Sequence, residues 1–524
     1  MMRTRLVSAT ALAAVAVLAG CGSSVSSSQA TIGPLNESLG VPGFTVAPGT
    51  PGAPIATSPA TGTTGPATPT QSASRGHGAT SIPTSVASTT EIQPSQSLGG
   101  GATSTAPTPT GGRTTSTPVK ATGPITVGFL TTATTNAAQY GASNGNTVSE
   151  TGIDDALVNA LNKQGGIDGR QLKVVFAHTD TGGSDWAGEF QAACSTFTQD
   201  NHVDAVLGYA FDYAPAFESC LAQKGIPHIS DSYAVTSQAE MAKYPLYWSL
   251  DTPPIEQREM AKYEGAIKTG VLTPANKLGV ILDTCAGNQA AWQGTVLPFL
   301  QAHHINVAPP FTIACGTGQN AGIVATVGSL TNVLLRFRSE GVNRISFETA
   351  EGPALLLSSI EAQTQGYHPD WIVSSLAGLA VIGGETPIPQ MQKTYGFGWI
   401  PSEDVPPQYA PAKDAAQLRC LSLLHSQKEY PKAAADFVYA YDACEAVFVY
   451  ADALTHDGGD TTGTAVSQAI ASLGTSFQST LNLGGKSDFS AARHNDAPMV
   501  YKPINWDGDC HCFRYGSQTF KMPS

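Results

Sequence analysis

The sequence has few charged side chains for its length. Asp, Glu, Lys and Arg make up 13% of its 524 residues, against about a quarter in average globular chains. Residues 22–123 carry much of this deficit, because 66 of these 102 residues are Ser, Thr, Pro or Gly, five are charged and Phe44 is the one aromatic. Such a segment buries too little apolar surface to offset its chain entropy. A chain of 524 residues exceeds what one small module contains. Residues 22–123 are predicted to be a disordered tether.

Positive charge is especially scarce in the rest of the chain. Residues 124–524 hold 22 Lys or Arg against 38 Asp or Glu. A protein that follows a nucleic-acid backbone needs clustered positive charge. Nucleic acid is therefore not an expected partner, and an acidic, moderately apolar domain suits a soluble extracytoplasmic role.

The first apolar run is too short to cross a membrane. Residues 6–19 follow two arginines, and their length is typical of a secretory signal rather than of a span of ~20 residues. The run ends in LAGC at residues 18–21, which resembles the bacterial lipobox. The resemblance implies a lipoprotein signal peptide at 1–20 and a lipid on Cys21, followed by the tether to residue 123, and so an anchor on the outer face of the cell membrane. The alternatives are a buried helix with an incidental cysteine and a mucin-like scaffold in place of a tether.

An even number of cysteines agrees with export. Eight remain besides Cys21, which indicates up to four disulfides in an oxidising compartment. Connectivity does not follow from sequence, but nearness favours the pairs Cys194 with Cys220, Cys285 with Cys315, Cys420 with Cys444 and Cys510 with Cys512. The last pair rests on elimination, because one intervening residue makes a tight ring. Half a metal site at 510–512 is the alternative, but no second Cys/His cluster accompanies it, so no metal is predicted.

Strand and helix patterns alternate from Ile125 onward. A short apolar strand at 125–130 precedes a helix at 151–164, a strand at 172–177 and further helices and strands to 230. Such alternation is typical of a parallel sheet wrapped by helices. A second series begins after residue 250, and a third block, with a helix at 433–454 and a β-rich end at 500–515, must complete one or both sheets. Open α/β sheets bind ligands at the carboxyl ends of their strands.

One motif carries a specific resemblance. Residues 161–170 read LNKQGGIDGR, and after a strand, Asp180 and a helix, residues 203–208 read VDAVLG. This resembles the start of a type 1 periplasmic-binding fold in the Leu/Ile/Val-binding family of solute-binding proteins that feed ABC importers. The motif itself is structural, because the glycine pair ends the helix and Gly169 permits a tight turn. The similarity extends from about Pro124 to the C-terminus.

The resemblance implies the architecture and the function. The periplasmic-binding domain at 124–524 is expected to have two lobes, each an open, mainly parallel sheet flanked by helices. We assign 124–250 and 375–483 to the N-lobe and 251–374 and 484–524 to the C-lobe. The three crossings near Leu250, Ser374 and Leu483 are the expected hinges. The implied function is the capture of a small polar ligand, an amino acid or an amide-like solute, by a monomer that delivers it to ABC permease subunits, without a cofactor.

The family positions its ligand with loops of both lobes. Backbone amides and hydroxyls after the first, third and fourth N-lobe strands suit a carboxylate; here these positions are Thr134, Thr135, Tyr209, Ala210, Phe211, Ser230, Asp231, Ser232 and Tyr233. Ser230 and Ser232 are the preferred residues, with ordinary turn residues as the alternative, and Asp212 nearby argues against simple carboxylate capture.

The C-lobe of the family commonly pairs an acidic residue with the ligand's ammonium group. Glu348 and Glu351 follow an expected strand and suit this role, or else they are solvated carboxylates at a helix start. The family's frequent Tyr-Gly after the first C-lobe strand is missing, and residues 285–289 read CAGNQ instead. Asn288 and Gln289 would therefore offer amide hydrogen bonds to another polar solute.

Enzyme motifs are absent from the sequence. The segment 484–487 ends like a phosphate loop, but Thr480 replaces the required glycine and no strand precedes it. The chain is thus predicted not to be an enzyme. The rivals to transport are a ligand-sensing or scaffold receptor that uses the same fold, and an extracellular hydrolase, which requires a nucleophile with a base within ~3 Å.

Overall fold

The computed structural model describes residues 123–132, 148–179, 186–208, 214–230, 236–250, 252–315, 321–495 and 497–523. The signal peptide, Cys21 and the tether lie outside this part of the chain. No helix of the described residues is long and apolar enough to cross a membrane.

The first sheet contains five parallel strands in the order β2-β1-β3-β4-β5. They are β1 (Ile125–Thr132), β2 (Leu172–Thr179), β3 (Ala205–Leu207), β4 (His228–Ser230) and β5 (Tyr247–Ser249). The helices that follow these strands are α2 (Glu150–Lys163), α3 (Trp186–Ser195) with the π-helical turn η2 (Thr196–Asp200), α4 (Pro215–Gln223) and α5 (Gln238–Lys243). This sheet and its helices form the N-lobe.

The glycine motif is structural, as expected. Ser149 caps α2 by accepting a hydrogen bond from the Gly152 amide. Gly166 and Gly169 have φ angles of 78° and 79°, which glycine adopts most readily. A Cβ on Gly166 would lie 1.8 Å from the Arg170 carbonyl oxygen. The glycines therefore permit the tight turn from α2 into β2.

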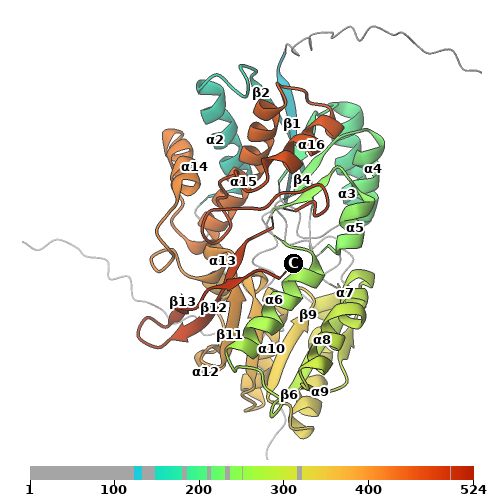
Figure 1. Cartoon of the computed structure of the whole chain (residues 1–524), viewed down its shortest axis with the longest axis vertical. Coiled ribbons are helices and arrows are strands. Elements are labelled where there is room, and N and C mark those ends of the chain that lie inside the picture. Colours follow the sequence, from blue (N-terminus) through green and yellow to red (C-terminus); the bar gives the residue numbers. More distant parts are fainter. Residues whose placement is uncertain are drawn as a thin grey trace, which may run out of the picture. The chain divides into compact units, whose positions relative to one another are not determined.

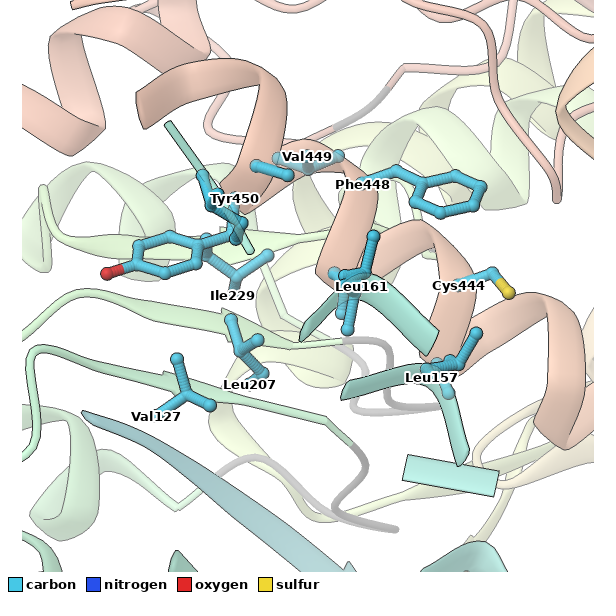
Figure 2. Close-up of a cluster of buried hydrophobic side chains, with 14 of the residues drawn as sticks. Val127, Leu157, Leu161, Leu207, Ile229, Cys444, Phe448, Val449 and Tyr450 are labelled. Atoms are coloured by element: carbon cyan, nitrogen blue, oxygen red, sulfur yellow. The ribbon is translucent and has the colours of Figure 1, made fainter. Parts of the chain in front are cut away.

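Three later helices complete the N-lobe: α14 (Ala415–Ser426), α15 (Ala434–His456) and α16 (Gly463–Leu473). Figure 1 shows α15 beside α2 and α16. Figure 2 shows part of the core between α15 and the sheet, where the Tyr450 side chain lies near Ile229 and Leu207 and the Phe448 ring points away from them. These side chains are almost fully buried, because α15 is apolar nearly all round and is enclosed on most sides.

The second sheet has nine strands and is mixed. Its order is β13-β12-β11-β10-β9-β6-β7, with β8 beside β6 and β14 beside β12. The parallel strands are β6 (Lys277–Asp283), β7 (Asn306–Val307), β8 (Phe311–Ile313), β9 (Arg344–Glu348), β10 (Asp370–Ser374) and β11 (Thr394–Gly398). The antiparallel ones are β12 (Val500–Asp507), β13 (Cys512–Tyr515) and β14 (Phe520–Lys521).

Helices on this second sheet complete the C-lobe (Figure 1). They are α6 (Ile255–Lys268), α7 (Ala286–Ala291), η3 (Trp292–Val296), α8 (Leu297–Ala302), α9 (Ala321–Ser339), α10 (Glu351–Thr364), η4 (Ser375–Ala377), α11 (Leu379–Ile382), α12 (Ile388–Met391) and α13 (Pro401–Asp404).

Two of the expected crossings between lobes are corrected. The assignment of residues from 375 onward to the N-lobe is wrong as far as β11, which pairs with β10 and β12 of the C-lobe. Residues 484–495 were assigned to the C-lobe, but Asn495 forms a bridge with Ser249 of β5. The chain thus recrosses between α13 and α14, and again between Asn495 and β12. The second crossing was predicted too early, near Ser374. The four-residue helices α11 and α12 that follow show no periodicity that would assign them to the C-lobe. The first crossing lies between β5 and α6, next to Leu250.

The four predicted disulfides are confirmed. Three of them join α3 to α4, the end of β6 to the end of β8, and α14 to α15, through Cys194–Cys220, Cys285–Cys315 and Cys420–Cys444. The fourth, Cys510–Cys512, lies in the hairpin between β12 and β13.

Candidate functional site

The carboxyl ends of the N-lobe strands lead into the expected ligand loops. Most of these loops lie outside the described residues: Thr134, Thr135, Tyr209, Ala210, Phe211, Asp231, Ser232 and Tyr233. Their ligand contacts stay predictions. Ser230 is described; it ends β4, is 1% exposed, and its carbonyl oxygen accepts a hydrogen bond from the Leu250 amide.

One polar pair at this edge was missed from the sequence. The Thr131 hydroxyl lies 2.6 Å from Nδ1 of His178, and the two residues belong to neighbouring strands β1 and β2. Both residues stand within two positions of the carboxyl end of their strand. The sequence did hold a signal for this pair, because Thr131 and His178 lie at the same distance from the ends of their two apolar strands.

The C-lobe presents three polar side chains at the same kind of edge. Asp283, Glu348 and Ser374 are the last residues of β6, β9 and β10, which are neighbours in the sheet. Because carboxyl ends of parallel strands share one edge, these groups lie together where open α/β sheets bind ligands. Asp283 and Ser374 did not figure among the predicted ligand residues.

Asp283 organises the first loop of the C-lobe. Its Oδ1 accepts a hydrogen bond from the Cys285 amide at 2.9 Å, and its Oδ2 accepts one from Asn288 Nδ2 at 2.8 Å. Gln289 Nε2 donates to the Asp283 carbonyl oxygen at 2.5 Å. Burial raises the pKa of Asp283, and the hydrogen bonds that it accepts oppose this shift. The Cys285–Cys315 disulfide ties this loop to the end of β8.

The two predicted amides thus differ in what they offer. Gln289 already uses its amide nitrogen on the Asp283 carbonyl. The Asn288 side chain is 4% exposed, and its Oδ1 has no hydrogen-bond partner in the described part of the chain. A buried acceptor without a donor is unfavourable by about 1–3 kcal/mol, so Asn288 Oδ1 is suited to a donor that arrives with a ligand.

Five buried ionisable residues form what we call the α6 charge cluster: Arg258, Glu259 and Lys262 of α6, Glu348 of β9 and Glu351 of α10. The reading of Glu348 and Glu351 as solvated carboxylates is wrong, because each is 1% exposed. Ion pairs join Glu259 to both Arg258 and Lys262. A buried charge is tolerated only when paired, which explains why these residues occur together.

Lys262 and Glu351 tie α6 to two strand ends. Lys262 Nζ donates to Glu351 Oε1 at 2.8 Å and to the Phe347 carbonyl oxygen at 2.7 Å. Glu351 Oε2 accepts from both the amide and the hydroxyl of Ser374, at 2.7 and 2.6 Å. Both carboxylate oxygens of Glu351 are thus engaged within the chain, and its contact with a ligand stays a prediction.

Glu348 is the third acidic residue of the α6 charge cluster, which has two basic residues. Burial raises the pKa of Glu348 well above its usual value, and the charge of Glu259 raises it further. The Tyr263 hydroxyl donates to Glu348 Oε1 at 2.7 Å. Burial disfavours the charge on Glu259, but Arg258 and Lys262 outweigh it and lower the pKa of Glu259. The cluster therefore places three acidic residues opposite two basic ones, and Glu348 is the acid whose pKa burial raises.

Arg258 is the least satisfied member of the cluster. It is 0% exposed, and its Nη1 has no hydrogen-bond partner among the described residues. The charge of Arg258 also lowers the pKa of Asp283 slightly, against the effect of burial. Arg258, Glu259 and Lys262 were missed from the sequence, although their spacing puts charges on one face of a helix that is otherwise buried.

A second acidic pair follows β11. Asp404 and Glu403 are buried at the end of α13, a helix that contacts α15 of the N-lobe. Burial raises the pKa of Asp404 to about 7, against the hydrogen bonds that it accepts from Tyr515, Ser375 and the Ile400 amide. Burial also raises the pKa of Glu403 well above its usual value, and the charge of Asp404 adds to the shift.

No group of three or more metal-ligating side chains occurs in the described ranges.

The model of the periplasmic binding protein family matches residues 124–502, which is most of the chain. The chain belongs to this family. Its members are substrate-binding proteins, not enzymes, and the predicted resemblance to the type 1 periplasmic-binding fold is confirmed. A search of curated proteins finds no match to this periplasmic binding protein.

Solved structures agree on the fold. A leucine-binding protein from Thermotoga maritima is 12% identical and matches with a TM-score of 0.54, covering 76% of this chain and 99% of its own. A solute-binding protein from Rhodopseudomonas palustris in complex with 4-hydroxybenzoate is 15% identical, with a TM-score of 0.56 and coverages of 76% and 98%. A substrate-binding protein of an ABC transporter from Aeropyrum pernix is 13% identical, with a TM-score of 0.59 and coverages of 77% and 97%.

Proposed function

We propose that this periplasmic binding protein is a lipid-anchored, extracytoplasmic monomer that captures a small polar ligand between its lobes and delivers it to an ABC importer. The observation that carries the proposal is the buried, unpartnered Oδ1 of Asn288 beside Asp283, at the carboxyl edge of the C-lobe sheet. Family membership supports the transport role, because the solved relatives include substrate-binding proteins of ABC transporters. Ser230 and the neighbouring N-lobe loops supply the opposite wall.

The ligand we favour has a neutral hydrogen-bonding group at its C-lobe end. The carboxylate of Glu351 is engaged by Lys262 and Ser374, and burial raises the pKa of Glu348, which disfavours its charged form. An ammonium group would thus find little negative charge to replace its water. Asn288 Oδ1 accepts from a hydroxyl or an amide equally well. An amide-like solute or a hydroxylated acid fits better than a simple amino acid.

Matched ligands test this proposal. Purified residues 124–524 are screened by thermal shift and then by calorimetry, with leucine against 4-methylpentanoate, tyrosine against 3-(4-hydroxyphenyl)propanoate, and glutamine, short peptides and sugars alongside. A ligand present at 100 times its Kd adds ~2.7 kcal/mol of stability. We expect binding by an amide or a hydroxylated acid. A preference for the amino acid within each pair contradicts the ligand class, and no shift with any compound contradicts the solute-binding role.

Anchoring is tested separately. Cys21 is the residue that the lipobox resemblance marks for lipid attachment, and stable anchoring needs two or more acyl chains. The full chain is expressed in a bacterium and membranes are separated from the soluble fraction. We expect the wild type in the membrane and Cys21→Ser in the soluble fraction. Retention of Cys21→Ser in the membrane contradicts the lipid anchor.

A further inference from the structure

One of the four disulfides closes almost no loop. The three others join cysteines that are 24 to 30 residues apart in sequence and lie on separate elements. Cys510 and Cys512 are two residues apart in the hairpin of β12 and β13. A disulfide stabilises a fold mainly by restricting the unfolded chain, and this effect grows with loop length. Cys510–Cys512 therefore contributes little as a structural link.

The hairpin around this disulfide has its own supports. Asp507 pairs with Cys512 and Trp506 with Phe513 in the antiparallel ladder. The Asp507 side chain accepts a hydrogen bond from the Asp509 amide at 2.8 Å and forms an ion pair with Arg514 at 3.0 Å between Oδ2 and Nε. These contacts hold the turn at 508–511 without the sulfur–sulfur bond. Opening the disulfide should leave the hairpin folded.

The ring holds a strained and accessible residue. His511, between the two cysteines, is exposed and has φ of 52°, in the left-handed region that disfavours a residue with a Cβ by roughly 1–2 kcal/mol. Both cysteines are half-buried, as are Cys285 and Cys315, whereas Cys420 and Cys444 are fully buried. The left-handed residue between the cysteines is what distinguishes this pair from Cys285–Cys315. Exposed or strained disulfides are the labile ones, and buried disulfides of stable folds resist reduction.

We infer that Cys510–Cys512 is a thiol–disulfide exchange site, separate from the ligand site, whose reaction partner is a low-molecular-weight thiol. A thiolate attacks one sulfur of the pair, a mixed disulfide forms and the other cysteine leaves as a thiolate, which takes up a proton. A second thiolate then attacks the mixed disulfide. The products are the Cys510/Cys512 dithiol and the oxidised partner disulfide, so two electrons pass from two thiols to the protein.

Equilibration in glutathione buffers tests this site. The full folded chain is incubated at a series of ratios of reduced to oxidised glutathione, quenched with acid and alkylated, and each cysteine pair is quantified by peptide mass spectrometry. Relief of the left-handed conformation of His511 when the disulfide opens accounts for about five-fold. We expect the Cys510–Cys512 pair to be half-reduced in buffer about five-fold less reducing than any other pair requires.

The other three disulfides are the internal controls. Circular dichroism and the midpoint of thermal unfolding are measured on the same samples. The double variant C510S/C512S, which cannot form this disulfide, represents the reduced hairpin. We expect both the selectively reduced protein and this variant to keep the fold and a midpoint within a few degrees of the oxidised wild type. Reduction of Cys510–Cys512 together with the other pairs, or only as the chain unfolds, would overturn the inference.

Discussion

Lys262 and Glu351 form a fully buried ion pair, with 2.8 Å between Nζ and Oε1. The pair connects α6, the first helix after the chain leaves the N-lobe sheet, to the edge of the C-lobe sheet where ligands are expected. Through the Phe347 carbonyl and the Ser374 amide it fixes the ends of β9 and β10.

Removing one partner of this pair should be strongly destabilising. In Lys262→Met the buried carboxylate of Glu351 loses its ion-pair partner and Glu259 keeps only Arg258, and we expect the free energy of unfolding to fall by about 3–5 kcal/mol. Urea denaturation measures the change. Lys268→Met on the same helix is the control, because its ion pair with Glu264 is partly exposed and contributes at most ~1 kcal/mol. Equal losses in the two variants would refute the role of the buried pair.

Asp404 should make stability depend on pH. Because burial raises the pKa of Asp404 to about 7, the native chain keeps a proton that the unfolded chain releases near its usual pKa of about 4. The native state binds more protons in this window, so stability falls as pH rises from about 4 to about 7, by about 4 kcal/mol for this group. In Asp404→Asn the fall should be smaller by about this amount, and the part that remains comes from other buried acids with raised pKa values, such as Glu348 and Glu403. Denaturation at several pH values measures it.

An exposed acid gives the comparison for Asp404. Asp509 lies on the surface of the β12–β13 turn, so Asp509→Asn should keep the wild-type dependence of stability on pH. If Asp404→Asn and the wild type lose stability in parallel between pH 4 and 7, Asp404 is not the group that retains the proton.

The glycine beside Asp404 should not tolerate a methyl group. A Cβ on Gly398 would lie 2.2 Å from Asp404 Oδ2, so Gly398→Ala must displace a buried carboxyl that Tyr515 and Ile400 hold in place. We expect a loss of about 1–3 kcal/mol in thermal or urea unfolding. A Cβ on Gly384 would have open space around it, so the control variant Gly384→Ala should change stability by less than about 1 kcal/mol. A neutral Gly398→Ala would show that this packing is adaptable.

Asn288 should contribute to ligand binding. Asn288→Ala removes the unpartnered acceptor Oδ1 and also the Nδ2 group that donates to Asp283 Oδ2, and is expected to raise the Kd of a ligand found in the screen by about 10-fold, the value of one good hydrogen bond. Calorimetry measures the affinity. Asn306→Ala at the opposite edge of the same sheet, on an exposed residue of β7, should leave the Kd unchanged. An unaltered Kd in Asn288→Ala would remove Asn288 from the ligand site.

Local patterns predicted much of the fold and part of the candidate site. The apolar strands of β1 and β2, the turn at Gly166 and Gly169, and the disulfides between nearby cysteines depend on neighbouring residues, so they can be read along the chain. The C-lobe edge was only half anticipated. Asn288 was proposed as a ligand residue, but Asp283, which orients it, was not, because a buried aspartate at a strand end looks the same in sequence as an exposed one.

By itself, the sequence determined the family of this protein and the alternation of strands and helices, because these follow from short-range spacing and from a motif that turns the chain. It favoured the pairing of the cysteines by their nearness, and the structure decided that pairing. Tertiary structure decided which lobe receives β11 and what Glu348 and Glu351 do. Strand partners and the environment of a carboxylate depend on contacts between distant residues: Lys262 reaches Glu351 across 89 positions. Glu348 and Glu351, for which the sequence also allowed a solvated position, are buried members of the α6 charge cluster.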